Sequence, residues 1–594
     1  MSAANTARIR KQKKAPIFVV IGNPPYNMGQ VNENDQNKNR KYKHMDARVQ
    51  ETYTRASTAT LRNKLSDPYV KAFRWASDRI RAGGVVAFVS NDSFVDQIAF
   101  DGMRKYLAHD FDRIYVLDLS GNVRKNPKLS GTTHNVFGIQ VGVAITLLIK
   151  KAQHDIAKPG EIFYATAGED WKKEQKYSQL NDWEDLHGAQ WKKITPDAKN
   201  TWLTAGQRHE FEGFLPIGIK SEKDTEDCEC LFRLFSLGVV TSRDAWVYNH
   251  SPDSILSNVK RIVSTFHRER QRFLTLTPKE KKKYAPTIGE HDIKWTDRLI
   301  EAVKSGDELK VEPWKIRRSL YRPYNSEYLY FDHLLNQRRY QQHRIFPNES
   351  CEAENISIIV KNSGEWPFFV LAVNSLSDLL PQGGSQCFPY YTYDEAGTNR
   401  HRNITDWALT EFRSHYGQKS NTKRDIFHYT YALLHHPEYR TRYAANLKRE
   451  LPRIPLAPDF DEYARIGSDL MKLHLEYEQQ REYQLKRRET GKLDWRVEKM
   501  SLSKDKTQLK YNDFLTMNGI PPEVYEYRLG NRSALEWVID QYRVTTDKRS
   551  GIVNDPNRDD DPEYIVRLIG QVVTVSLETV KLVRDLSALP LLPS

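Results

Sequence analysis

The segment Ala15 to Asn27 has the sequence APIFVVIGNPPYN. Its apolar part, Ile17 to Ile21, is short, β-branched and aromatic and ends at Gly22, which predicts a strand buried on both faces of a parallel sheet. Ligands bind at the carboxyl ends of such strands. Two prolines follow Asn23, and because each fixes φ and restricts the residue before it, we expect a rigid loop there. An ordinary strand-ending turn has the same local pattern, so the rest of the chain must distinguish the two.

Composition indicates a multidomain protein with a polyanionic partner. The chain has 594 residues, a net charge of +13 and a mean hydropathy of −0.69, which is enough for two to four domains with sizeable cores. Its basic residues cluster among aromatic residues, a pattern typical of nucleic-acid binding. Net charge that serves only solubility is the alternative.

No membrane segment, secretion signal or metal site is expected. The longest apolar run, Ile139 to Ile149, is too short to span a bilayer and is interrupted by polar residues. The basic amino terminus has no apolar stretch of the signal-peptide type, so we expect a cytoplasmic protein. Four cysteines lack the spacing of a zinc site and are too few for a disulfide scaffold.

Strand and helix patterns alternate over the first part of the chain. Asp67-Pro68 caps a helix that ends at Gly83-Gly84. It is followed by a strand (85–90), a helix (95–107), a strand (114–119) and the apolar run 137–149. This order predicts an α/β fold, a doubly wound parallel sheet over residues 1–165.

The rest of the chain has a different composition and pattern of apolar runs. Residues 166–458 are rich in Trp, Tyr, Arg and His, with short runs broken by Pro and Gly, and we expect a separate mixed α+β domain. From Tyr463 to Tyr477 apolar residues recur at helical spacing, which predicts a helical part over 459–594. Its polar continuation through Arg481 to Arg488 is expected to be a solvated face.

Asn23, Pro24, Pro25 and Tyr26 suit methyl transfer to an amino nitrogen that is conjugated to a ring. The lone pair of such a nitrogen is delocalised, and acceptors at the Asn23 side chain and the Pro24 carbonyl would favour its reactive, pyramidal form. An adenine must leave the duplex to reach them, and Tyr26 would stack on the flipped base. Asn23 to Tyr26 are therefore the predicted catalytic residues.

The motif Gly22 to Tyr26 resembles the catalytic motif of amino-methylating DNA methyltransferases, in which Asn at the first position indicates adenine N6. The resemblance implies S-adenosylmethionine as the methyl donor. By the same pattern Phe137 is the candidate second aromatic wall of the base pocket. A core phenylalanine is the alternative for this residue.

Four later segments resemble the specificity region of type ISP restriction-modification enzymes. They are VVTSRDAWVYN (239–249), SLYRPYNSEYLYFDHLLNQRRY (319–340), DIFHYTYALLHHPEYR (425–440) and LGNRSALEWVIDQY (529–542). The resemblance implies an incomplete methyltransferase sheet over 1–165, a target-recognition domain over 166–458 and its helical part over 459–594. The implied partner is double-stranded DNA.

Two parts of a complete type ISP enzyme have no counterpart in this sequence. Only 22 residues precede Asn23, so the S-adenosylmethionine loop that the family has before the motif is missing. No GxxxxGK[ST] motif or nuclease carboxylate cluster is present either. We expect a carboxyl-terminal piece that needs an amino-terminal polypeptide carrying the cofactor loop, helicase and nuclease. The alternative is a non-catalytic DNA-binding specificity subunit.

Arginines interleaved with tyrosines form the predicted DNA-reading surface, since guanidinium groups suit phosphates and guanine edges alike. The candidates are Arg317, Arg318, Arg322, Arg338 and Arg339. A second candidate is Arg243, in TSRDAW, for which a core ion pair, with Asp244 or another carboxylate, is the alternative. The polar segment Asn27 to His44 is predicted to be a loop that orders on DNA or stays solvated.

Overall fold

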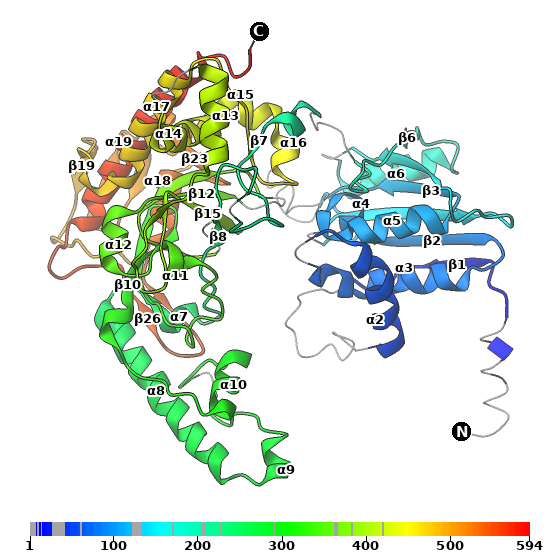
Figure 1. The fold of residues 1–594 in the computed structure, drawn as a ribbon, viewed down its shortest axis with the longest axis horizontal. Coiled ribbons are helices and arrows are strands. Elements are labelled where there is room, and N and C mark those ends of the chain that lie inside the picture. Colours follow the sequence, from blue (N-terminus) through cyan, green and yellow to red (C-terminus); the bar gives the residue numbers. More distant parts are fainter. Residues whose placement is uncertain are drawn as a thin grey trace. The chain divides into compact units, whose positions relative to one another are not determined.

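The computed structural model describes residues 8–593 except 9–10, 13–14, 27–41, 60–61, 122–132, 140, 169–170, 204–208, 226, 290, 362–365, 380, 382–383 and 418–420. It divides into two compact units, Met1–Ala205 and Gly206–Ser594, each described by itself (Figure 1). The division falls after the predicted boundary at residue 165 because the helix Lys173–Trp183 and the last strand of the sheet, Lys192–Ile194, also belong to the first unit. Residues 459–594 belong to the second unit and do not separate from it.

The first unit is built on one six-stranded sheet with helices packed against it (Figure 1). The strand order is β1-β2-β4-β3-β5-β6. The strands are β1 Val19–Gly22, β2 Gly84–Asn91, β3 Arg113–Asp118, β4 Val143–Lys150, β5 Glu161–Thr166 and β6 Lys192–Ile194. The helices are α2 Lys43–Val49, α3 Pro68–Arg79, α4 Ser93–Asp96, α5 Asp101–Asp110 and α6 Lys173–Trp183.

The sheet is mixed, so the prediction of a wholly parallel sheet was wrong. β1 and β2 pair in parallel, as do β3 and β5. β4 runs antiparallel to both β2 and β3, and β6 antiparallel to β5. Parallel neighbours need a crossover connection, usually a helix. The described residues between β3 and β4 form turns and no helix, so the chain returns antiparallel.

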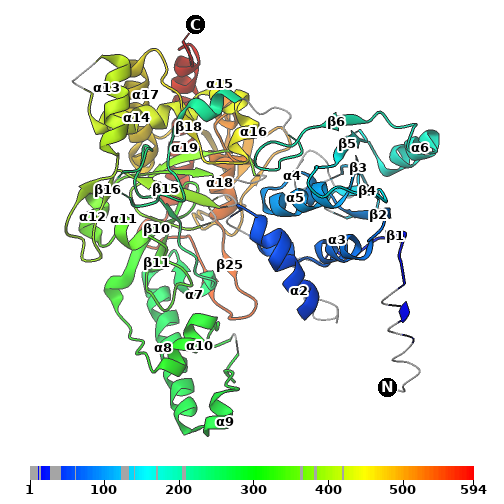
Figure 2. The same cartoon turned by 45° about the vertical axis from the view of Figure 1, so that its right-hand side comes forward.

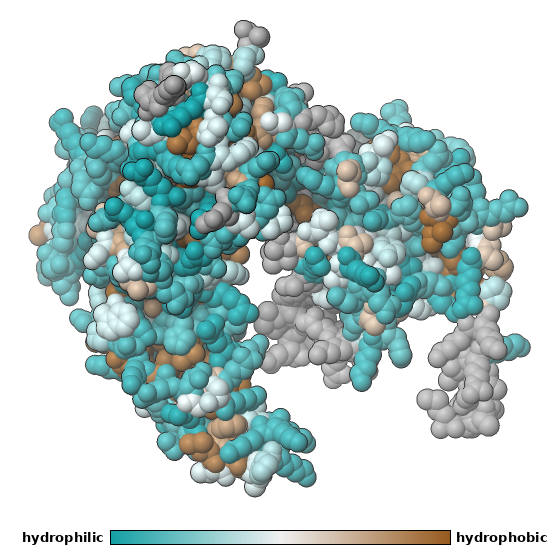
Figure 3. Space-filling view, viewed as in Figure 1, coloured by the Kyte–Doolittle hydropathy of each residue, from teal (hydrophilic) through white to brown (hydrophobic). Residues whose placement is uncertain are grey.

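β1 was predicted to be buried on both faces, and this was also wrong. Phe18 and Val19 are each 58% exposed and Ile21 is 78% exposed. The cause is position, since β1 is the edge strand and has one strand neighbour among the described residues. Figure 3 shows hydrophobic side chains gathered where Figure 1 places β1. The apolar sequence therefore lies at an open edge.

The helix predicted after Asp67 is confirmed as α3, but it ends at Arg79 and not at Gly83-Gly84. The Asp67 carboxylate accepts a hydrogen bond from the N–H of Tyr69, Pro68 occupies the first turn, and Val70 and Phe73 are fully buried. The predicted loop over Asn27–His44 lies mostly outside the described residues, and Tyr42 precedes α2, which begins at Lys43.

The second unit contains several small sheets. Two of them have the orders β14-β10-β11-β9 and β13-β12-β15-β8, the first of which carries candidate arginines on β10, and a third, β19-β22-β21-β20, lies in the carboxyl-terminal region. The strands are β7 Leu215–Pro216, β8 Ser236–Leu237, β9 Tyr248–Asn249, β10 Ile316–Arg322, β11 Asn325–Tyr330, β12 Ser357–Lys361, β13 Val370–Val373, β14 Leu376–Ser377, β15 Ser385–Pro389, β16 Tyr391–Thr392, β17 His401–Arg402, β18 Arg453–Ile454, β19 Lys486–Glu489, β20 Ser501–Leu502, β21 Gln508–Lys510, β22 Leu515–Asn518, β23 Arg528–Leu529, β24 Arg532–Ser533, β25 Thr545–Thr546 and β26 Val553–Asn554.

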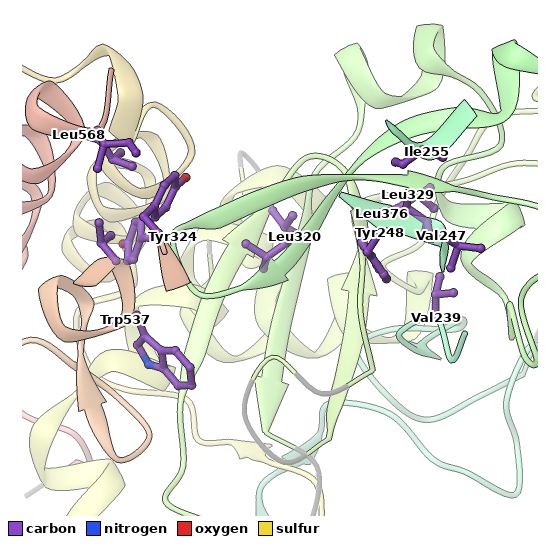
Figure 4. Packing of buried hydrophobic residues seen from close by; sticks show 14 of the residues in the cluster. Val239, Val247, Tyr248, Ile255, Leu320, Tyr324, Leu329, Leu376, Trp537 and Leu568 are labelled. Atoms are coloured by element: carbon purple, nitrogen blue, oxygen red, sulfur yellow. The ribbon is translucent and has the colours of Figure 1, made fainter. Parts of the chain in front are cut away.

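Helices cover these sheets and extend away from them (Figure 2). They are α7 Asp244–Val247, α8 Pro252–Thr275, α9 Pro278–Lys281, α10 Asp297–Ser305, α11 Gln342–Ile345, α12 Glu349–Glu354, α13 Asp406–Tyr416, α14 Lys423–His435, α15 Pro437–Arg442, α16 Ala444–Leu447, α17 Phe460–Leu475, α18 Ala534–Gln541 and α19 Tyr564–Ser587. The largest core cluster joins β11 and α8 to the carboxyl-terminal helices, and Figure 4 shows Leu329 and Ile255 in one part of it and Trp537 and Leu568 in another.

The region 459–594 was predicted to be helical and is mixed. The apolar stripe from Tyr463 forms α17, but this helix ends at Leu475. The polar run that follows contains the exposed strand β19, not a continued helix, because it lacks apolar residues at helical spacing. Cys228 and Cys230 are joined by a disulfide, which the sequence did not lead us to expect.

Candidate functional site

Asn23–Tyr26 lie at the carboxyl end of β1, where several loops of the first unit meet. The strand register pairs Gly22 with Phe88, Asn91 with Val143 and Asp118 with Ala144. The carboxyl ends of β1, β2 and β3 and the amino end of β4 are therefore on one edge of the sheet. The loop before β4, which contains Phe137, is at the same edge as Asn23.

Two residues of the motif pack against the protein and the other two are exposed to solvent. Pro24 is buried, whereas Asn23 and Pro25 are exposed. The Tyr26 ring is half-buried against the core of the unit, and this burial raises the pKa of its hydroxyl. The Asn23 carboxamide has no hydrogen-bond partner in the part of the chain that the structure describes. Its amide oxygen and nitrogen are available to a ligand.

Phe137 projects from a loop whose backbone is held by hydrogen bonds to the buried Asn135 side chain. The buried Asn135 side chain donates to the carbonyl of Val141 at 2.6 Å and accepts from the N–H of Phe137 at 2.9 Å. The Phe137 ring is 49% exposed, so the alternative of a core phenylalanine is wrong. A Cβ atom at Gly142 would lie 1.9 Å from Oδ2 of Asp92, which shows how closely this loop approaches the end of β2.

Arg243 is part of the core of the second unit. Its side chain is 1% exposed and donates to the carbonyls of Lys294 (3.2 Å) and Leu335 (2.9 Å) and to the Thr296 hydroxyl (2.8 Å). Burial lowers its pKa to about 10. Its fork of donors is occupied by backbone carbonyls and the Thr296 hydroxyl and not by the predicted alternative, a carboxylate. The structure gives Arg243 no surface for DNA.

Arg317 is buried, and the Arg322 side chain, 20% exposed, is held by an ion pair and a ring contact. Arg317 is 5% exposed and pairs with Glu352 while donating to the carbonyl of Pro347 at 3.1 Å. Arg322 donates to Asp378 at 2.9 Å, and its guanidinium lies 3.9 Å from the centroid of the Tyr321 ring. Both residues are on β10, and their charges stabilise buried polar groups.

Arg318, Arg338 and Arg339 remain at the surface. Arg318 is 51% exposed and reaches Glu478 at 3.3 Å. The Arg338 side chain is exposed and donates only to the Gln337 carbonyl among the described residues, while its backbone pairs with Val240. Arg339 lies over the Phe331 ring at 5.5 Å, and burial lowers its pKa. These three residues keep their status as candidate DNA contacts.

Two residues near this surface were not predicted from the sequence. Arg298 of α10 is close enough to Arg339 to lower its pKa through like-charge repulsion. Trp314 is 69% exposed and directly precedes the segment that leads into β10. The first residue of β10, Ile316, pairs with Tyr330, which is next to Phe331 in the chain. Convergent guanidinium groups beside exposed aromatic rings are a common composition of nucleic-acid surfaces. The sequence feature that could have identified Trp314 is its position as a single tryptophan in the basic segment VEPWKIRR (311–318).

Comparison with known proteins assigns the second unit. Residues 230–568 match the family model of the type ISP C-terminal specificity domain. The chain belongs to the type ISP family. The match lies within the second unit and includes every candidate arginine.

Solved structures, among them two of type ISP enzymes, extend the similarity to both units. The ATP-dependent type ISP restriction-modification enzyme LlaBIII bound to DNA has 32% identity and a TM-score of 0.87, over 99% of this chain and 38% of that one. A nuclease-deletion mutant of the type ISP enzyme LlaGI with a DNA substrate mimic has 32% identity and a TM-score of 0.86, over 99% and 46%. A DrdV–DNA complex has 37% identity and a TM-score of 0.86, over 98% and 58%.

This type ISP chain therefore spans between 38% and 58% of the length of these solved structures. No curated protein was found to match it. Of the helices in the described part of the chain, none has the length and apolarity needed to cross a membrane. The described residues also contain no group of three or more His, Cys, Asp or Glu side chains arranged to hold a metal ion.

Proposed function

We propose that this chain is the base-binding and target-recognition part of a site-specific DNA adenine-N6 methyltransferase of a type ISP restriction-modification system. The observation that carries the proposal is the exposed Asn23 carboxamide, which has no partner among the described residues and lies at the sheet edge that also bears Phe137. The similarity to structures of type ISP enzymes bound to DNA supports duplex DNA as the partner.

In this proposal the target adenine leaves the duplex and its amino group faces Asn23. The Asn23 amide oxygen and the Pro24 carbonyl accept the two amino hydrogens, which favours the pyramidal form of the nitrogen. Because Pro24 is buried, the position of its carbonyl is fixed by the fold before the substrate binds. Tyr26 and Phe137 supply two aromatic rings for the flipped base, and stacking offsets part of the unstacking cost of a few kcal/mol.

The described residues do not fit the methyl donor, S-adenosylmethionine, on their own. At the edge that carries Asn23, the described glycine after β3 is Gly121, and a Cβ atom there would lie 2.4 Å from the His134 carbonyl oxygen. This glycine permits close packing of two loops and does not leave room for a ligand. We assign donor binding to residues outside the described part of this chain.

The open edge of β1 is the place where such residues would attach. On the side away from β2 the strand has no strand partner among the described residues, and the side chains of Phe18, Val19 and Ile21 are exposed. Exposed apolar edge strands are templates for pairing with another strand. We propose that an amino-terminal polypeptide adds the remaining strands and the donor loop there, together with the helicase and nuclease.

A non-catalytic specificity subunit is the second candidate, and the poor fit to the methyl donor favours it. Calorimetric titration of S-adenosylmethionine into the chain, alone and with the amino-terminal polypeptide, distinguishes the two. The enzyme proposal predicts no binding alone and binding, with methylation of adenine in duplex DNA, in the mixture. Binding of DNA by a mixture that never transfers a methyl group would favour the specificity subunit.

A further inference from the structure

One part of the second unit, the arm Lys260–Lys283, extends away from the sheets. It comprises most of α8 and all of α9. The buried side chains of α8, among them Ile262, Phe266 and Phe273, face the core. α9 follows after a short link, with a capping box between Thr277 and Glu280. Figures 1 and 2 both show α8 leading away from the sheets, with α9 at its far end.

The arm holds a large share of the positive charge of the protein. Between Lys260 and Lys283 the sequence has nine Lys and Arg residues and two Asp and Glu residues, a net charge of +7 out of +13 for the whole chain. Both acids are engaged locally. The buried Glu269 pairs with Arg272 at 2.8 Å, and Glu280 accepts from the Thr277 hydroxyl at 2.6 Å.

Of the other basic residues, Arg261 and Arg270 donate to the carbonyls of Ser550 and Gly306, and Lys281 lies over the Phe273 ring. Five more are exposed and have no carboxylate partner among the described residues. They are Lys260, Arg268, Lys279, Lys282 and Lys283. Like charges on adjacent turns and in an unbroken run repel one another, so they do not stabilise the arm. Neither local helix stability nor an ion-pair network accounts for this charge.

The exposed cations follow one path along the arm. Lys260, Ser264 and Arg268 are four residues apart and therefore lie on one face of α8. Ser264 and the next exposed residue on this face, Gln271, are hydrogen-bonding groups without charge. Lys279, Lys282 and Lys283 are in or next to α9, which follows α8 in the chain. The face is thus a row of cations and small polar groups with no acidic side chain.

A row of this kind fits a regularly charged polyanion. Lysine is a compact point charge on a flexible stem, suited to phosphate oxygens, whereas base edges are read better by the planar fork of arginine. Four of the five free cations are lysines. We propose that the arm binds the phosphate backbone of duplex DNA without reading its sequence. This rests on the proposed function, in which the chain binds DNA.

The test compares two variants of the full chain with equal loss of charge. The arm variant is Lys279→Gln/Lys282→Gln/Lys283→Gln. The control is Lys492→Gln/Lys499→Gln/Lys504→Gln, which removes three exposed lysines from the region of the β19–β22 sheet. The affinity of each protein is measured over a salt series for the tightest-binding duplex from a random pool and for an unrelated duplex. Thermal melting confirms that all three proteins are folded.

The proposal predicts that the arm variant lowers the slope of log K against log salt by about 0.9 for each lost contact, hence by up to about 3. Both duplexes should be weakened by the same factor, and the control should match the wild type. A wild-type slope in the arm variant would overturn the proposal while DNA binding stands, and so would weakening of the selected duplex alone. If the variant instead loses only its binding to the amino-terminal polypeptide, the arm docks protein and the proposal is wrong. Failure of the wild type to bind any duplex would overturn the proposed function as well.

Discussion

Replacing Tyr26 separates stacking on a flipped base from a structural role of the same ring. Base–aromatic stacking is worth about 1 to 3 kcal/mol per base on alanine substitution. At about 1.4 kcal/mol per tenfold change in rate, Tyr26→Ala should reduce the methylation efficiency, kcat/KM, by about 5- to 150-fold. Tyr26→Phe keeps the ring. Because burial raises the pKa of the hydroxyl, this group is neutral in the wild type and its removal changes no charge.

The Tyr26 hydroxyl has no hydrogen-bond partner among the described residues, so we expect Tyr26→Phe to stay within about twofold of the wild type. The half-buried ring also packs against the core, and its loss should lower the free energy of unfolding of the first unit by about 1 to 2 kcal/mol. The assay must therefore report on the base as well as on the fold.

The measurement uses duplex DNA with 2-aminopurine at the target adenine and the chain combined with its amino-terminal polypeptide. Fluorescence reports unstacking of the base, methyl incorporation reports turnover, and thermal melting reports folding. The stacking role predicts that Tyr26→Ala loses turnover and leaves the flipped base less ordered, at a temperature where the variant is folded. Equal defects in Tyr26→Phe and Tyr26→Ala would refute the reasoning, since the hydroxyl and not the ring would then matter.

Three further predictions follow from the placement of side chains. Phe137→Ala should lower turnover without lowering the melting temperature, because the ring is exposed and Asn135 holds its loop; a loss of folding would contradict a pocket role. Arg317→Ala should lower the unfolding free energy by about 3 to 5 kcal/mol, because it leaves the Glu352 carboxyl buried without its partner. Burial raises the pKa of Glu352 to about 7, above its ordinary 4.5, so its contribution to stability falls as the pH rises from about 4.5 to 7. In the variant this fall should extend to higher pH. Urea unfolding over a pH series tests whether stability falls or rises over this range. Arg338→Ala and Arg339→Ala should leave stability unchanged and weaken DNA binding. A residue that reads a base should cost about 1 to 3 kcal/mol at one base position, whereas a residue that contacts phosphate should weaken binding to all sequences. Unchanged binding would remove both residues from the interface.

Local signals in the sequence predicted the elements around Asn23 well. Asp67-Pro68 caps α3 through a hydrogen bond that depends on neighbouring residues, and Gly83 and Gly84 mark the start of β2. The direction of β4 was not predicted, since its sequence is equally apolar in either direction. It depends on the connection from β3, which has turns in place of a crossover helix among the described residues. The exposure of β1 depends on its place at the edge of the sheet among the described residues, which its own sequence does not encode.

The DNA-reading surface was predicted less well, because arginine and tyrosine serve buried polar networks and nucleic-acid surfaces alike. Arg317 and Arg318 are adjacent on β10, and alternation along the strand places the first inside and the second outside. Arg243 is surrounded by carbonyls from segments far apart in the sequence, so no local pattern could reveal its burial. Composition identified the region, and only the fold separates structural arginines from exposed ones.

The central claim is that Asn23 accepts hydrogen bonds from the amino group of a flipped adenine. The most direct measurement compares methyl transfer and DNA affinity for the wild type and Asn23→Ala, each combined with the amino-terminal polypeptide. Because the Asn23 side chain is exposed and has no partner among the described residues, its loss should leave folding and specific DNA binding nearly intact. The account predicts that methylation is abolished while DNA affinity changes by less than about threefold. Methylation at the wild-type rate, or a loss of DNA affinity as large as the loss of rate, would contradict it.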